Sequence, residues 1–455
     1  MGMSQICQNE IEEAWEQLPG IVSNIVPPSF PDRDFLLTDY GAVGDGVTDC
    51  TDAFIKAMAE ANAAGGGRIV VPQGTFFTGP IHFRSNVNLH ITNGATIKFS
   101  QEPEKYLPMV LNRFEGVELY NYSPLLYSYN VVNIAVTGEG ILDGNADNNH
   151  WWPWKGQEKY GWREGQPHQA QDRDKLFAMA EQNVPAEERR FGKGHYLRPS
   201  FIQFYNSKNI LIEGITVKDS PMWQICPVLC ENITVNKVKI VGHGPNTDGF
   251  NPESCRNVLI QNCYFDNGDD CIAIKSGRNA DGRRINIPCE NIVILNNYMK
   301  DGHGGITIGS EISGSVRNVF AENNVMDSVN LDRALRFKTN SIRGGVIENI
   351  YFRNTVVKSI GEEIIIVDMD YEEGDAGEFT PNVRNIFVEN LESYGGKTGI
   401  LFSAYERAPI TNIKLVNCSL HNVQSPFFLK HVKELYCDNV YINEKNYDSI
   451  LNSKG

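Results

Sequence analysis

Residues Asn291-Ile-Val-Ile-Leu-Asn296 hold the pattern on which the expected fold depends, two asparagines that enclose a short apolar segment. Segments of this kind recur through most of the chain, and each begins with an asparagine. They start at Asn209, Asn232, Asn257, Asn291, Asn318, Asn349, Asn385 and Asn412. Successive starts lie 23 to 36 residues apart, which is the spacing of a stacked supersecondary unit.

Each repeat predicts a short β-strand, because β-branched residues alternate within it and Asn, Gly and Asp stand at its boundaries. No helical apolar pattern separates the strands, so a βαβ sheet is disfavoured. The leucine-dense signature of a leucine-rich repeat is missing, and a β-propeller would show antiparallel hairpins and longer periods. We therefore predict an all-β chain, a right-handed parallel β-helix. Each coil would hydrogen-bond to the next, and the asparagines would stack at turns with left-handed backbone angles.

The composition is that of a soluble folded protein, with 41% apolar and 21% charged residues among 455. The formal net charge of -15 argues against the basic face of a general nucleic-acid binder, so no nucleic-acid partner is expected. A local basic pocket can still bind an anionic substrate. No apolar run reaches the roughly 18 residues of a transmembrane helix, so no membrane span is expected.

We expect one catalytic domain with an attached extension. Residues 1–33, which include Pro27-Pro28-Ser29-Phe30-Pro31, should pack on the outside of a single β-helix domain over residues 34–455. A polar insertion at about residues 145–198 interrupts the repeats and carries four tryptophans, Trp151, Trp152, Trp154 and Trp162. Insertions in solenoids emerge on one face, often the binding face. Most of the ten cysteines should be small buried hydrophobes, with one or two disulfides left open.

Polar residues recur at the coil spacing in the second half of the chain. The series is Asn246-Thr247-Asp248, Gly268-Asp269-Asp270, Gly302-His303-Gly304, Arg336-Phe337-Lys338 and Tyr371. The steps from Asp269 to His303, then to Phe337 and then to Tyr371 are each 34 residues, about one solenoid unit. We therefore expect these residues to form a patch across neighbouring coils.

The carboxyl groups of this series suit the hydrolysis of a glycosidic bond. That reaction needs one carboxylic acid to protonate the leaving oxygen and a second carboxylate to act on water or carbon. Asp248, Asp269 and Asp270 can supply both. Consecutive aspartates cannot both face outward from a regular strand, so we expect a turn or bulge there, helped by Gly268.

The cations of the series suit an acidic sugar. Strand alternation places Arg336 and Lys338 on one face and Phe337 on the other. The two cations would then bind a substrate carboxylate, while Phe337 packs in the coil interior.

In these motifs and their order the chain resembles glycoside hydrolase family 28, the polygalacturonases and their relatives. The similarity runs from Asp39-Tyr-Gly-Ala-Val-Gly-Asp-Gly46 to near the C-terminus. The commonest form of the family has Ile between the two cations, where this chain has the inward-facing Phe337.

The resemblance implies hydrolysis with inversion at the anomeric carbon, with no metal and no other cofactor. It implies that Asp269 is the general acid, that Asp248 and Asp270 activate the water, and that His303 supports the acid. It also implies a set of substrate-binding residues: Arg336 and Lys338 on the galacturonate carboxylate, Tyr371 in the same subsite, Asn246, and Arg283 in a loop similar to those of bacterial exo-acting relatives.

The tryptophan-rich insertion predicts exo action, because a large loop across one end of an open groove makes a pocket. The expected substrate is therefore a pectic polysaccharide or oligogalacturonide, cleaved one galacturonic acid unit at a time. A secreted or periplasmic location follows from this substrate, although the N-terminus shows no signal sequence.

Three alternatives stay open. A rhamnogalacturonan hydrolase would keep the fold and mechanism but change the sugar. A pectate lyase would need a calcium site and a base that removes the C5 proton. A non-catalytic carbohydrate-binding β-helix would have no reason to place these side chains in this order.

Overall fold

The repeated segments form strands that pair in parallel with the strands one coil away, in a computed structural model that describes residues 3–454. The segment at Asn291 lies in β22 (Cys289–Leu295), between β19 (Arg256–Gln261) and β25 (Val316–Glu322). Equivalent apolar positions are in register, with Ile292 opposite Val258 and Val319. The predicted right-handed parallel β-helix is thereby confirmed.

The chain divides into two compact units, which we describe separately. The amino unit comprises residues 26–255 and 266–269. The carboxyl unit comprises residues up to 25, 256–265 and 270 onwards. Residues 1, 2 and 455, which belong to the predicted extension and domain, lie outside the described residues.

The amino unit stacks its coils in three parallel ladders, whose strands run in the order β3-β6-β11-β15-β17, β4-β7-β12-β16-β18 and β5-β10-β14. Helix α3 (Thr51–Ala63) lies between β2 and β3 in the sequence, and β8 (Val110–Phe114) and β9 (Val117–Asn121) form an antiparallel hairpin. The remaining strands are β1 (Asp34–Leu36), β2 (Asp45–Asp49), β3 (Gly67–Val71), β4 (Gly74–Thr78), β5 (Ile81–His82), β6 (Val87–Ile91), β7 (Ala95–Phe99), β10 (Leu126–Tyr129), β11 (Val132–Gly138), β12 (Ile141–Asp143), β14 (Ile202–Tyr205), β15 (Lys208–Glu213), β16 (Thr216–Lys218), β17 (Glu231–Asn236) and β18 (Lys239–Gly242).

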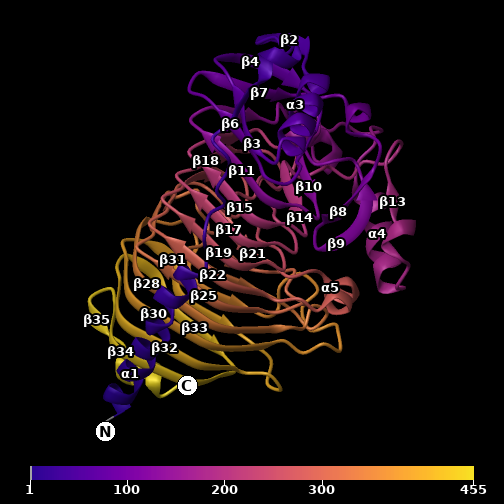
Figure 1. Cartoon of the computed structure of the whole chain (residues 1–455). Helices are drawn as coiled ribbons and strands as arrows, with labels where there is room; N and C mark the ends of the chain where they lie inside the picture. The colour runs from indigo at the N-terminus through magenta and orange to yellow at the C-terminus, as the bar shows by residue number, and fades with distance from the viewer. Residues whose placement is uncertain (1–2, 455) are drawn as a thin grey trace. The chain divides into compact units, whose positions relative to one another are not determined.

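The carboxyl unit continues the same construction with longer strands. One ladder runs β19-β22-β25-β28-β30-β32-β34, and its later strands lie side by side in Figure 1. A second sheet runs β21-β24-β27-β29-β31-β33 among the described residues. The elements are β21 (Ile272–Ile274), α5 (Asn279–Ile285), β23 (Tyr298–Met299), β24 (Ile306–Ile308), β26 (Val325–Asp327), β27 (Leu335–Lys338), β28 (Val346–Ser359), β29 (Glu363–Asp368), β30 (Asn382–Ser393), β31 (Gly396–Ser403), β32 (Ile410–Leu420), β33 (Val423–Lys430), β34 (Val432–Ile442), β35 (Lys445–Asn446) and α6 (Asp448–Asn452). Strand β20 (Tyr264–Asn267) contributes residues to both units.

The asparagines that begin the repeats form a ladder of side-chain hydrogen bonds from coil to coil. In the carboxyl unit Asn349 Nδ2 donates to Asn318 Oδ1 at 3.0 Å, and Asn349 Oδ1 accepts from Asn385 Nδ2 at 2.8 Å. The backbone φ of Asn349 is 59°, a left-handed conformation that Asn tolerates better than most residues. The predicted stacking of asparagines at turns is therefore confirmed.

The N-terminal helices cover an apolar column on the outside of the carboxyl unit. Helices α1 (Met3–Glu16) and α2 (Leu18–Ser23) contribute Ile11, Ala14, Trp15, Leu18 and Ile25 of the following turn to one buried cluster. Their partners are in-register, outward-facing residues of successive strands: Leu259, Val293, Phe320, Tyr351 and Phe387. Burial of this column removes a continuous apolar strip from water.

The insertion is packed firmly into the amino unit. Its helix α4 (Ala170–Glu181) buries Leu176 and Ala180 in a cluster with Phe191, which belongs to β13 (Arg190–Phe191), and with Trp223. The helix ends at Glu181, and the short turn η5 (Ala186–Glu188) follows it.

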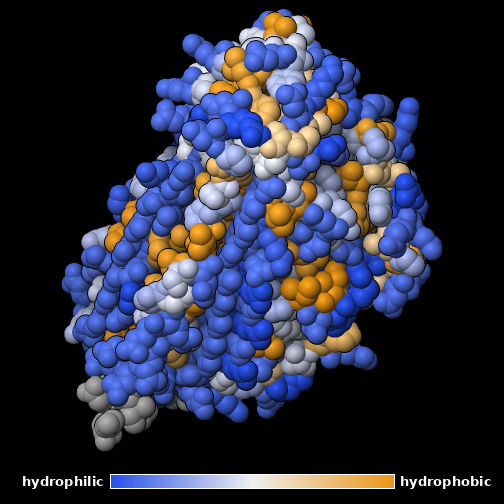
Figure 2. All heavy atoms as spheres, viewed as in Figure 1, coloured by the Kyte–Doolittle hydropathy of each residue, from blue (hydrophilic) through white to orange (hydrophobic). Residues whose placement is uncertain are grey.

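The surface and the cysteines agree with a folded protein in water. Figure 2 shows a mostly hydrophilic face on which apolar residues form small separate groups. The nine cysteines whose side chains are described are all buried, as expected for small hydrophobes. Within residues 3–454, no helix is both long enough and apolar enough to cross a membrane.

The asparagine ladder makes a specific contribution to stability. We expect Asn349→Ala to lower the free energy of unfolding by about 3 kcal/mol, because it removes two side-chain hydrogen bonds and because alanine tolerates the left-handed conformation less well than asparagine. Asn349→Gly loses the same hydrogen bonds without the conformational penalty, so it should cost about 1–2 kcal/mol less. Urea denaturation of both variants checks this order, which equal losses would contradict.

Candidate active site

Asn246 occupies a left-handed turn of the amino unit and is held by a buried arginine. Its φ is 56°. Arg198, only 1% exposed, donates to Asn246 Oδ1 at 2.8 Å and to the carbonyl oxygens of Pro221 and Pro245 at 2.8 and 2.7 Å. Burial lowers the pKa of Arg198 to about 10, against the opposing charges of Glu115, Tyr160 and Asp269.

Asp248 and Asp269 are brought together with this turn in the amino unit. Asp248 is 3% exposed and accepts a hydrogen bond from Asn251 Nδ2 at 3.0 Å. Asp269 is half-buried, and its Oδ2 accepts a bond of 3.5 Å from Asn246 Nδ2. The less buried of the two carboxyl groups is therefore Asp269.

The turn that carries Asp269 depends on Gly268, as the sequence predicts. Residues 268–271 separate β20 from β21, and Gly268 N–H donates to Gly242 O at 2.7 Å. A β-carbon at Gly268 would lie 2.7 Å from Gly244 O and 2.9 Å from Thr247 Oγ1. Only glycine fits between these atoms without displacing the backbone.

Lys155, which sequence reasoning did not identify, brings a second positive charge toward Asp269 in the amino unit. It lies in the insertion, in the short helix η3 (Trp152–Lys155), and is half-buried. Burial lowers the pKa of Lys155, helped by Arg198 and Arg173 and opposed by Glu115 and Asp269.

Asp270 lies in the carboxyl unit, and two cations hold its carboxylate. It is 1% exposed, with Lys338 Nζ at 2.8 Å and Arg336 Nη1 at 3.2 Å. Thr307 Oγ1 donates to the same carboxylate at 3.1 Å. These contacts satisfy a buried negative charge that would otherwise be very costly.

The strand that carries the two cations has the predicted alternation. Arg336 and Lys338 of β27 face Asp270, while Phe337 is 1% exposed and packs edge-on against Phe352 at 6.3 Å. Burial alone would lower the pKa of Lys338, but the charges of Asp270 and Tyr371 oppose burial, and the pKa is raised.

Tyr371 lies beside the cations. Its ring centroid is 5.7 Å from the Arg336 guanidinium carbon and 5.4 Å from Lys338 Nζ. Burial raises the pKa of Tyr371, although both cations oppose the shift. Asp270, Arg336, Lys338 and Tyr371 thus form one cluster within the carboxyl unit.

The first of the equal 34-residue steps agrees with the strand register, because Ile272 pairs with Ile306, but the two later steps do not, and for them the expectation is wrong. In the sheet that contains β27, Ile306 pairs with Leu335, 29 residues later, and Leu335 pairs with Ile365, 30 residues later. The coils differ in turn length, so hydrogen bonds between strands set the alignment. Thr307, not His303, lies opposite Arg336.

Two other predicted residues have different surroundings. His303 is exposed, on the turn that leads to β24. A β-carbon at the adjacent Gly304 would lie 2.7 Å from Asp270 Oδ1, so the turn packs closely on that carboxylate. Arg283 Nη1 donates to the carbonyl oxygens of Ile342 and Arg343, and its guanidinium lies 3.5 Å from the Phe379 ring centroid.

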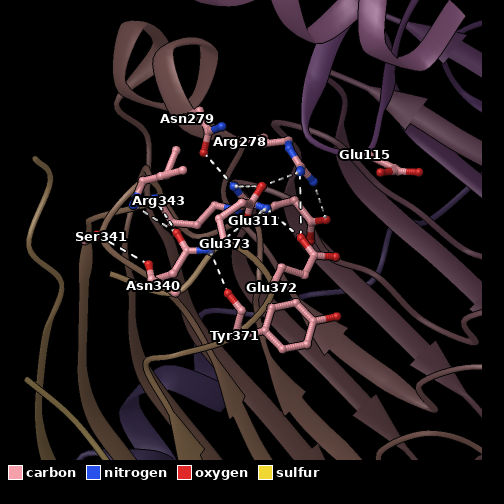
Figure 3. A network of polar contacts seen from close by, with 12 residues as sticks. Glu115, Arg278, Asn279, Glu311, Asn340, Ser341, Arg343, Tyr371, Glu372 and Glu373 are labelled. Carbon is pink, nitrogen blue, oxygen red and sulfur yellow. Dashed lines mark hydrogen bonds and ion pairs between the residues drawn. The ribbon is translucent and has the colours of Figure 1, made fainter. Parts of the chain in front are cut away.

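A network of buried charges adjoins the carboxyl-unit cluster, at the ends of β21, β24, β27 and β29 (Figure 3). Glu311 has Lys275 Nζ at 3.5 Å and Arg278 Nη1 at 3.7 Å. Burial would raise the pKa of Glu311, but Lys275, Arg278, Lys338 and Arg343 together lower it to about 2.

Sequence reasoning missed Arg198, Thr307 and this network. Thr307 stands three residues after Gly304 and could have been found from its place on the coil after Asp270. Arg198 and Arg343 are single residues without a repeating partner, and nothing in the sequence marks them.

The depressed pKa of Glu311 predicts an acid-sensitive component of stability. A carboxyl group whose folded pKa is below its ordinary value of 4.5 stabilises the fold above that value. This contribution is lost as the pH falls from 4.5 toward 2 and amounts to roughly 3 kcal/mol. The unfolding free energy of Glu311→Gln should fall less steeply than that of the parent between about pH 5 and 3. Denaturation curves across that range check this, and parallel slopes would contradict it.

Two family descriptions match the chain. Residues 187–443 match glycosyl hydrolases family 28, and residues 36–153 match rhamnogalacturonase A/epimerase, pectate lyase-like. The first match covers more than half of the 455 residues.

Individual relatives agree with this match. The chain is 29% identical to a probable polygalacturonase of Vitis vinifera, over 85% of this chain and 74% of that protein. It is 27% identical to the exo-poly-alpha-D-galacturonosidase of Dickeya chrysanthemi, over 78% of this chain and 62% of that protein. The crystal structure of a hyperthermoactive exopolygalacturonase from Thermotoga maritima is 48% identical, with a TM-score of 0.93 and coverage of 96% of this chain and 97% of that one. The chain belongs to glycosyl hydrolases family 28.

Proposed function

We propose that this protein is an exo-acting hydrolase that releases galacturonic acid units from pectic chains or oligogalacturonides. The observation that carries the proposal is the Arg336–Asp270–Lys338 cluster in a family 28 chain, which combines a carboxylate for water activation with two cations for an acidic sugar. The similarity to exopolygalacturonases supports the same substrate.

The proposed chemistry needs three carboxyl groups in two roles. Asp269, the least buried of them, would donate its proton to the leaving glycosidic oxygen. Asp248 and Asp270 would accept a proton from the water that attacks the anomeric carbon on the opposite face, which inverts its configuration. The two cations beside Asp270 favour its ionised form, as a base requires. His303 would support the protonation of the acid.

The substrate carboxylate would bind at Arg336 and Lys338, with Tyr371 in the same subsite. Asn246 and Arg283 would complete the predicted substrate contacts. The backbone bonds and ring contact of Arg283 also anchor its own loop. A family match over 36–153 described as rhamnogalacturonase A/epimerase keeps a rhamnogalacturonan hydrolase as the second candidate.

The insertion would close one end of the groove and so favour exo action. In the amino unit Trp151 and Trp154 pack with ring centroids 5.1 Å apart, and Trp154 packs against Tyr196 at 5.2 Å. These ring contacts would fix the position of the insertion, which would form one wall of the groove. We treat residues 34–455 as one catalytic domain and 1–33 as its extension, and we infer a secreted or periplasmic location from the polymeric substrate.

Asp269→Asn should reduce turnover of oligogalacturonides by at least about 10³-fold, because a general acid cannot be replaced by an amide. The half-buried side chain contributes little to the core, so thermal unfolding should be unchanged. Asp266→Asn, the same substitution three residues earlier on β20, serves as the matched control and should retain activity. Full activity in Asp269→Asn would refute the assigned acid.

Exo action can be tested by shortening the insertion. A β-carbon at Gly156 would lie 3.0 Å from the His168 ring, so residues 157–167 can be replaced by a two-glycine link that closes the loop. The parent should release only saturated galacturonic acid from polygalacturonate, and the shortened enzyme a mixture of oligomers. Mixed oligomers from the parent would refute exo action, and unsaturated products that disappear with chelator would indicate a lyase. Cleavage of rhamnogalacturonan alone would support the second candidate.

A further inference from the structure

Tyr371 lies in a tight turn that several side chains of the carboxyl unit hold in place. Gly374 N–H donates to Tyr371 O at 3.2 Å, and Asn340 Nδ2 donates to the same oxygen at 2.9 Å. Glu372 has a φ of 51°, a left-handed conformation that is unfavourable for a residue with a side chain. This conformation therefore needs external support.

Arg343, which follows β27 on the preceding coil, supplies that support. It is 0% exposed, and its Nη2 lies 3.0 Å from Glu372 Oε2 and 3.4 Å from Glu373 Oε2. Its Nη1 donates to Asn279 Oδ1 at 2.9 Å. A planar guanidinium between two consecutive carboxylates fixes both side chains and the backbone between them.

Arg278 grips the same two carboxylates from another coil. Its Nη2 lies 3.4 Å from Glu373 Oε1 and 3.8 Å from Glu372 Oε2. Asn340 Nδ2 also donates to Glu373 Oε2 at 2.8 Å. Figure 3 shows these interactions converging on the glutamates next to Tyr371.

The network is more elaborate than stability alone requires. Replacing buried ion pairs by well-packed apolar residues is often neutral or stabilising. Here the glutamate side chains are 40% and 35% exposed, and the arginines are 0% and 5% exposed. The buried arginines fix the position of a turn that is itself half-exposed. Tyr371 lies on that turn, beside Arg336 and Lys338.

We propose that Arg343 and Arg278, acting through Glu372 and Glu373, are positioning residues that hold the Tyr371 turn and thereby set the affinity of the carboxylate-binding subsite. The inference rests on the proposed function, because it assigns this affinity to galacturonides. None of the four side chains needs to touch the substrate.

Glu373→Gln tests the proposal. It preserves shape but removes the charge that both arginines hold. The KM for a defined oligogalacturonide should rise about tenfold while kcat changes less than about threefold, because the network affects binding and not proton transfer. Arg343→Lys keeps the charge but loses the forked geometry and should give an intermediate KM. If this buried variant does not fold, the half-exposed Glu373→Gln carries the test alone.

Asp375→Asn is the matched control. Asp375 lies on the same segment, and its Oδ2 accepts from Arg407 Nη1 at 2.6 Å in an exposed ion pair. The variant removes the same charge from the same segment without removing a contact of Arg278 or Arg343, so KM should stay at the parent value.

The Tyr371→Ala background separates positioning from general stabilisation. If the network acts through Tyr371, Glu373→Gln should cause no further rise in KM once Tyr371 is truncated. An equal rise in both backgrounds, an unchanged KM in the parent background, or a joint loss of kcat and thermal stability would overturn the proposal while leaving the proposed function intact. A parent enzyme that does not cleave oligogalacturonides would instead refute the proposed function, and the inference with it.

Discussion

Lateral hydrogen bonding between parallel coils is the interaction on which the rest of this structure depends. Backbone bonds join each strand to the strands one coil away, and the asparagine side chains extend the ladder into turns where φ is positive. A position on one coil is therefore always next to the same position on its neighbours. Apolar residues become continuous interior columns, and the outward column from Leu259 to Phe387 becomes an apolar strip that the N-terminal helices cover.

The same stacking gathers charge on and beside three strands of the carboxyl unit. Asp270 precedes β21, Arg336 and Lys338 lie on β27, and Arg278, Glu311 and Arg343 follow β21, β24 and β27. Removing these groups from water is costly, and ion pairs with residues on other coils offset that cost. The geometry of the carboxylate-binding cluster therefore depends on several coils together, and no single loop determines it.

The insertion in the amino unit is tied to the turn that carries two of the candidate carboxyl groups. Trp152 Nε1 donates to Ser220 O at 2.9 Å, and its indole lies 2.3 Å from where a β-carbon of Gly244 would be, two residues before Asn246. Arg198, at the end of the insertion, holds Asn246 itself. The insertion, which we propose closes the groove, therefore directly supports the turn at Asn246, which we propose is part of the active site.

Four features can be predicted from the sequence alone: the strand pattern, the parallel β-helix, the inward Phe337 between two cations and the turn at Gly268. These features follow from alternation and glycine requirements within a few residues, which are local properties of the chain. The three-dimensional structure was needed to establish how the coils align: Thr307 lies opposite Arg336 because strand hydrogen bonds, and not the 34-residue spacing, set the register. It also decided that Arg198 holds Asn246 and that Arg343 holds Glu372. These contacts join residues that are 48 and 29 positions apart. Because the turns between them differ in length, no regular spacing in the sequence indicates these contacts.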